Sequence, residues 1–129
     1  MTRTLKWFAA FCLAALSTSA MAGGPSPVGS WQVTTGEARY KVTACGDDNS
    51  LLCAKLVWLA PDQRTADNLA LLNTYVVEGA TPKGANKWSG NVVLDGHTYD
   101  GTMTFVSKNY LTLRGCAGIL CQTYEFTRI

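Results

Sequence analysis

The stretch WSGNVVLDGHTYDGTMTFV, residues 88–106, decides the fold. Apolar and polar residues alternate before and after its central Asp95-Gly96, which is the period of a strand with one face in a core. Asp-Gly is a favoured two-residue hairpin turn, because both residues tolerate a positive φ. The stretch therefore predicts two antiparallel strands. Their shared apolar face carries Trp88, Val92, Leu94, Tyr99, Met103 and Phe105.

Similar short runs with turn residues between them recur along the chain. Eight strands are predicted, over 30–34, 38–45, 51–59, 74–78, 87–94, 98–106, 110–116 and 121–128. Tight turns favour pairing in sequence order, and closing such a sheet into a barrel covers both its edges and its apolar face. The predicted fold class is all-β, a lipocalin-like, antiparallel up-and-down barrel of about eight strands. A β-sandwich of the same strands is the alternative.

Residues 60–86 interrupt this rhythm, because they contain only the weak strand at 74–78. Thr65 is a suitable N-cap for a short helix over the residues that follow it. Two interpretations stay open for this long, partly helical connection. The helix is either a lid that lays Leu69, Leu71 or Leu72 over the barrel mouth, or a packed connection that closes the barrel end.

Residues 1–22 have the features of a cleaved signal peptide. Arg3 and Lys6 precede an apolar run at 7–16, and Ala20-Met21-Ala22 fits the small-x-small pattern that signal peptidase reads. The apolar run is too short to span a bilayer, which takes about 20 residues. We therefore expect cleavage near Ala22, a periplasmic or secreted location, and one β-barrel domain at 23–129.

The mature chain is electrically neutral. Removing Arg3 and Lys6 from the 11 lysines and arginines leaves nine, which balance the 9 aspartates and glutamates. A neutral chain has no electrostatic footprint for nucleic acid and no polybasic segment for an anionic membrane. We expect no nucleic-acid partner and no stable membrane anchor, and the composition indicates no particular protein partner.

Four of the 5 cysteines lie in the mature chain: Cys45, Cys53, Cys116 and Cys121. An even number suits an oxidising compartment, and four cysteines allow three pairings. We expect the local pairs Cys45–Cys53 and Cys116–Cys121, because each pair flanks a turn. A zinc site is the rival interpretation, but these spacings and a single histidine fit it poorly. No metal is therefore expected.

The two ends of the mature chain carry a further pattern. Gly29-Ser30-Trp31 and Arg128 resemble the lipocalin and wider calycin pattern, in which the arginine lies over the tryptophan and closes one barrel end. Further pieces follow in order: Cys45-Gly46, Leu52–Trp58, Asp67-Asn68, Trp88-x-Gly90, Tyr99, Leu113–Cys116 and Thr127-Arg128. Together they resemble the exported bacterial domain-of-unknown-function family 2147. The resemblance implies export, a lipocalin-like barrel, and structural roles for Trp31 and Arg128.

The reactive side chains predict neither a catalytic residue nor a cofactor. His97 is the only histidine, and it directly follows the Asp95-Gly96 turn, whose residues are explained by turn geometry. The sequence contains no nucleophile elbow, no phosphate-binding glycine loop and no Cys-x-x-Cys motif. We therefore expect that the protein is not an enzyme.

The aromatic residues favour a binding role instead. Strand parity points several of them into the barrel, where they either fill the core or line a cavity for one small ligand. The predicted ligand-binding residues are Trp58, Trp88, Tyr99, Phe105 and Tyr40. The leading hypothesis is an exported module that binds a small hydrophobic or amphipathic molecule. The alternative is a filled barrel that acts through its surface and loops, as an envelope protein-interaction or inhibitor module.

Overall fold

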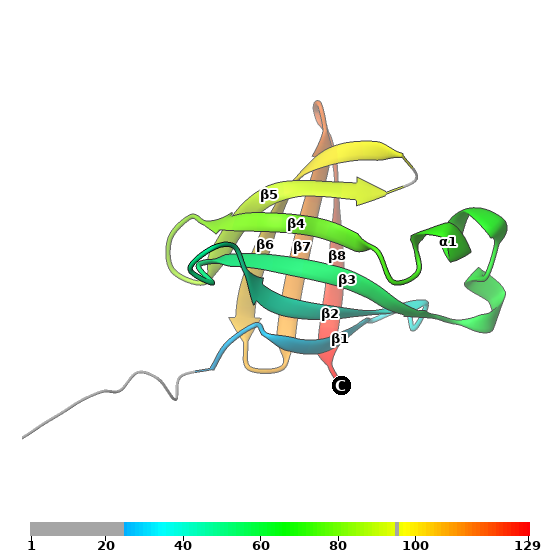
Figure 1. Cartoon of the computed structure of the whole chain (residues 1–129), viewed down its shortest axis with the longest axis horizontal. Helices are drawn as coiled ribbons and strands as arrows, with labels where there is room; N and C mark the ends of the chain where they lie inside the picture. Colours follow the sequence, from blue (N-terminus) through cyan, green and yellow to red (C-terminus); the bar gives the residue numbers. More distant parts are fainter. Residues whose placement is uncertain (1–24, 95) are drawn as a thin grey trace, which may run out of the picture.

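A computed structural model describes residues 25–94 and 96–129. The predicted signal peptide, residues 1–22, lies outside the described residues. Eight strands follow one another along the chain (Figure 1): β1 Gly29–Val33, β2 Ala38–Cys45, β3 Leu51–Leu59, β4 Tyr75–Pro82, β5 Lys87–Leu94, β6 His97–Ser107, β7 Tyr110–Ala117 and β8 Leu120–Arg128. The predicted strand bounds agree with these to within one residue everywhere except at β4.

The eight strands close into a barrel. Each strand pairs antiparallel with its neighbour in sequence, and β8 returns to pair with β1. The closing ladder sets Trp31 opposite Arg128 and Val33 opposite Phe126. Among the described strands, closure leaves no unpaired sheet edge. It confirms the predicted up-and-down barrel and excludes the sandwich.

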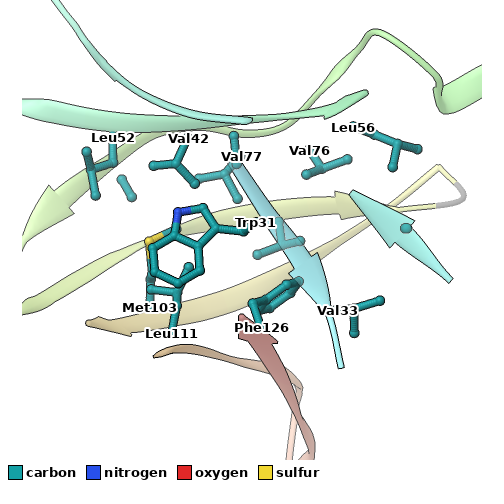
Figure 2. Packing of buried hydrophobic residues seen from close by; sticks show 14 of the residues in the cluster. Trp31, Val33, Val42, Leu52, Leu56, Val76, Val77, Met103, Leu111 and Phe126 are labelled. Carbon is teal, nitrogen blue, oxygen red and sulfur yellow. The ribbon is translucent and has the colours of Figure 1, made fainter. Parts of the chain in front are cut away.

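The inward-facing residues form one hydrophobic core. On β3, for example, Leu52, Ala54 and Leu56 are buried and alternate with more exposed neighbours, as the period of a strand requires. Figure 2 shows Trp31 near the middle of the cluster. The buried hydrophobic residues among those described are Trp31, Val33, Ala38, Val42, Leu52, Ala54, Leu56, Leu59, Val76, Val77, Ala80, Val92, Met103, Phe105, Leu111 and Phe126.

Trp31 and Arg128 close one end of the barrel. The Trp31 side chain is 0% exposed, and its Nε1 donates to the main-chain oxygen of Pro27 at 2.8 Å. The Arg128 guanidinium lies 4.4 Å from the centre of the Trp31 ring and donates to the main-chain oxygens of Ser26 and Lys108. This is the contact that the calycin resemblance implied. The hydrogen bonds of Arg128 thereby connect β8 to the segment before β1 and to the β6–β7 turn.

The connection from β3 to β4 lies at the opposite end. It contains η1 Pro61–Gln63 and α1 Ala66–Leu71. Thr65 caps α1 as predicted, because its Oγ1 accepts a hydrogen bond from the main-chain nitrogen of Asn68 at 3.2 Å. Leu71 and Leu72 are partly buried against the core. Within the described residues, no helix has the length and apolar character needed to cross a membrane.

β4 extends beyond its predicted end at Glu78. In the sequence, Gly79 favours the end of a strand, because glycine is common in turns. In the structure, Gly79 has a φ of 86°, and the pairing with β3 shifts between Leu52–Ala80 and Cys53–Glu78. One extra residue is thus accommodated as a β-bulge. The strand then continues to Pro82.

The predicted disulfides are confirmed. Cys45–Cys53 joins β2 to β3 next to their hairpin, at the end closed by Trp31. Cys116–Cys121 joins β7 to β8, and the two cysteines are directly opposite each other in the strand register. Each disulfide therefore staples one hairpin of the barrel.

Replacing Cys45 and Cys53 together with serine is expected to lower the free energy of unfolding by about 2 to 3 kcal/mol, because the unfolded chain is no longer restricted by the loop. Urea unfolding measures this loss. The matched variant replaces Cys116 and Cys121, whose sequence separation is 5 instead of 8. Its loss should be slightly smaller, since the closed loop is shorter. A larger loss for the second pair would contradict this account.

Candidate ligand-binding cavity

The side chains of the barrel do not fill its interior. A cavity of about 490 Å³ lies between the strands, and all eight strands contribute to its wall. Most of the wall consists of core residues. The wall includes Trp31, Met103, Leu111 and Phe126, which are among the core residues labelled in Figure 2. The cavity is therefore hydrophobic over most of its surface.

Small residues on the inner face explain the unfilled space. Ala38, Ala54, Gly115 and Ala117 all line the cavity. Gly115 has no atom within 4 Å of the position that a Cβ would take. An eight-stranded barrel has room either for a side-chain core or for one small ligand. With these small residues facing inward, the interior is left open.

The cavity opens at the end that carries the β1–β2 turn, the β3–β4 connection with α1, and the β7–β8 hairpin, all of which contribute lining residues. We call its border the polar mouth, which consists of Glu37, Gln63, Asn68, Gln122 and Tyr124. The Asn68 amide Nδ2 donates to the main-chain oxygen of Gln63 at 2.8 Å, and the Tyr124 hydroxyl donates to Gln122 Oε1 at 2.6 Å. The mouth thus combines one acid with neutral amide and hydroxyl groups.

Two of the predicted ligand-binding residues, Tyr40 and Tyr99, line the cavity. Phe105 is buried nearer the closed end, where its ring meets the Trp31 ring edge-on at 6.4 Å between centres. Trp88 borders a separate gap of about 10 Å³. The aromatic residues are thus divided between the cavity wall and the packed end of the barrel.

Trp58 lies on the outer face of the barrel. Strand parity predicts that it faces inward, and that prediction is wrong. On β2, Tyr40 is opposite Leu56, but the preceding Arg39 is opposite Trp58. Val57 is therefore an extra residue on β3, and this β-bulge reverses the alternation. Trp58 turns outward, where the Arg39 guanidinium lies 4.3 Å from the centre of its ring.

Sequence reasoning did not identify the polar mouth as a group. Tyr124 shares the parity of the apolar face, so alternation alone was enough to point it inward. Glu37, Gln63 and Asn68 come from a turn and from the helical connection, where strand periodicity does not apply. The available signal for the cavity itself was the run of small residues at inward positions, such as Gly115.

Tyr40 links the cavity wall to the polar mouth. Its ring meets Phe126 edge-on, with 5.6 Å between ring centres. Burial is the main cause that raises the pKa of the Tyr40 hydroxyl above its ordinary value of 10.0, and Tyr124 and Glu37 raise it further by repelling the phenolate. The folded protein therefore holds the Tyr40 proton more tightly than the unfolded chain does.

This pKa shift predicts a loss of stability at alkaline pH. Below about pH 10 the shift contributes fully to the free energy of unfolding. This contribution is lost as the pH rises through the folded-state pKa. Tyr40→Phe is expected to flatten this part of the pH dependence, which urea unfolding from about pH 8 to about pH 11 measures. Tyr75→Phe is the matched control, because Tyr75 is exposed on the outer surface. An unchanged slope for Tyr40→Phe would contradict the assignment.

No group of three or more His, Cys, Asp and Glu side chains within the described part of the chain is arranged to hold a metal ion. His97 lies at the exposed start of β6, and its ring is tilted against the Tyr99 ring at 6.4 Å between centres. The chemical character of the site is that of an apolar cavity with a polar border.

Comparison with known proteins covers the whole barrel. A family model described as "Uncharacterized protein conserved in bacteria (DUF2147)" matches residues 29–128. The match begins at the first residue of β1 and ends at the last residue of β8. No curated protein and no solved structure matches the chain.

Proposed function

We propose that this chain, which belongs to the DUF2147 family of bacterial proteins, binds one small hydrophobic or amphipathic molecule inside its barrel. The observation that carries this proposal is the open, largely apolar cavity of about 490 Å³. Ligand pockets have volumes of about 300 to 1,000 Å³, mostly apolar walls and a few well-placed polar groups. The barrel interior has each of these properties.

Burial of apolar surface would supply most of the binding energy. Moving apolar surface out of water gains roughly 25 cal/mol per Å², or about 0.8 kcal/mol for each buried methylene. The ordering of the ligand offsets part of this gain. Affinity should therefore rise about fourfold with each methylene of an alkyl ligand and stop rising when the cavity is full.

We further propose that binding takes place in the periplasm, after removal of residues 1–22. The basic residues, apolar run and Ala20-Met21-Ala22 site at the start of the chain support export. The two disulfides support it independently, because disulfides persist in oxidising compartments. Recovery of the mature protein in the periplasmic fraction is the expected result.

One surface feature favours a second function, that of a protein-interaction or inhibitor module. The β7–β8 hairpin carries Ile119 and Leu120, which are 96% and 76% exposed. The Cys116–Cys121 disulfide ties the base of this hairpin. Exposed apolar side chains that gather in one patch often mark contact sites. In this alternative, the hairpin tip carries the function and the cavity takes no ligand.

Native mass spectrometry of the mature protein, isolated gently from its own periplasm, separates the two functions. A reproducible extra mass that organic extraction removes, and that the extract restores, supports the carrier. The added extract should also change the tryptophan fluorescence, since Trp31 lines the cavity. A clean protein mass and no fluorescence response would favour the interaction module. Pull-downs that compare the unaltered protein with an Ile119→Ser, Leu120→Ser variant would then test that module.

A further inference from the structure

We infer that the ligand is an alkyl amine or a related amphiphile with a cationic head, and that an anionic head such as a fatty-acid carboxylate is selected against. This inference rests on the proposed function, because it assigns the chemistry of the head group to the same cavity. Its basis is the juxtaposition of an apolar interior with the Glu37 carboxylate at the polar mouth.

Glu37 is the only charged residue that lines the cavity among the described residues. Its Oε1 accepts the hydroxyl of Thr35 at 2.6 Å, and its second oxygen remains an acceptor for a ligand. The side chain is exposed at the cavity entrance. A head group that emerges from the cavity would therefore meet a negative charge.

Arg39 and Arg64 are close in sequence to residues of the polar mouth, but both make other contacts. The Arg64 guanidinium donates from Nε to the main-chain oxygen of Leu59 at 3.0 Å. Arg39 stacks on Trp58 outside the barrel, and its Nε donates to Gln32. Neither arginine lines the cavity. A carboxylate head would find no positive side chain among the described lining residues.

The neutral groups of the polar mouth do not reverse the preference for a cationic head group. The amides of Gln63, Asn68 and Gln122 and the hydroxyl of Tyr124 carry no charge, and each can both donate and accept, so they favour neither a cationic nor an anionic head group. The charge of Glu37 also acts further inside: after burial and Tyr124, it is the third cause that raises the pKa of the Tyr40 hydroxyl, so its negative potential extends to the cavity wall. An ammonium head gains from this potential, and a carboxylate head loses.

The size of the preference follows from the exposure of Glu37. An ion pair with an exposed carboxylate changes affinity by up to about fivefold, and the repulsion of a carboxylate is of similar size. Because both effects act on the ratio of the two affinities, we expect decylamine to bind about tenfold more tightly than decanoate. Decanol, which has the same tail and no charge, should lie between them.

Titration calorimetry of the full mature protein with decylamine, decanol and decanoate near pH 7 tests the inference. At this pH the amine is protonated and the acid is ionised, as Lys and Glu side chains are. Glu37→Gln should narrow the ratio of the amine and carboxylate affinities, and Glu37→Lys should invert it. Glu78→Gln is the matched control, because Glu78 is an exposed acid on β4 that does not line the cavity.

The outcomes separate this inference from the proposed function. If decanoate binds as tightly as decylamine or more tightly, or if Glu37→Gln leaves their ratio unchanged, the head-group inference is overturned and the carrier function stands. If none of the three compounds binds, the carrier function itself fails. A ratio that narrows for Glu37→Gln but not for Glu78→Gln is the expected result.

Discussion

Trp31→Ala is expected to lower the free energy of unfolding by about 3 to 5 kcal/mol, the range for removing a buried aromatic ring. Trp31 is fully buried, packs edge-on against Phe105 and lies under the Arg128 guanidinium. Its loss would leave a void at the closed end and remove the ring beneath Arg128. Since domains are stable by only about 5 to 15 kcal/mol, a large part of the variant should unfold in mild denaturant.

Urea unfolding followed by far-ultraviolet circular dichroism measures this loss without relying on tryptophan fluorescence. Trp58→Ala is the matched control, because Trp58 also lies beside an arginine but on the outer face. Trp58→Ala should lower the free energy of unfolding by only about 1 kcal/mol, because removing a ring from the outer face leaves no cavity in the core. Equal losses in the two variants would show that Trp31 has no special role in closing the barrel.

Gly115→Trp is expected to weaken the binding of decanol at least tenfold while leaving the protein as stable as before, or more stable. Gly115 lines the cavity, and a Cβ placed there meets no atom within 4 Å. Gly115 is not among the described residues with positive φ, so a side chain is tolerated. The indole would then occupy space that the ligand needs, and each 50 Å² or so of lost apolar contact costs about 1.3 kcal/mol.

Thr123→Trp is the control for this variant. Thr123 is exposed on β8 and adjoins the outward Arg114 in the strand register. The same ring is thereby added outside the barrel, and decanol affinity should stay within about twofold, a change of about 0.4 kcal/mol. If Gly115→Trp binds decanol as well as the unaltered protein, the ligand does not occupy the interior.

Local pattern was sufficient to predict the barrel and its disulfides. The Asp95-Gly96 sequence predicts a two-residue turn, and the alternating strands on either side of it pair in register from Lys87–Thr104 to Leu94–His97. The pairing of Cys116 with Cys121 was likewise predictable from local sequence, because the short β7–β8 hairpin places them opposite each other. Hairpins that pair neighbours in sequence need little long-range information, so periodicity and turn chemistry are enough.

The candidate site was harder to predict, because it depends on register and on volume. Trp58 shares the parity of Leu56, but the extra residue Val57 in the pairing with β2 turns it outward. Alternation tells which side chains face inward, and it does not tell whether they fill the interior. That depends on the barrel diameter and on inward residues as small as Ala54 and Gly115.

The proposed function depends on a ligand that occupies the barrel interior. Nuclear magnetic resonance of protein with isotope-labelled valine and leucine methyl groups, titrated with decanol, tests it most directly. If decanol enters the interior, the methyl signals of Val42, Leu56 and Leu111, which line the cavity, should shift together and saturate. Signals of Val57 and Val106, which are exposed, should stay in place. Shifts confined to the exposed methyl groups, or no shifts at all, would contradict the claim.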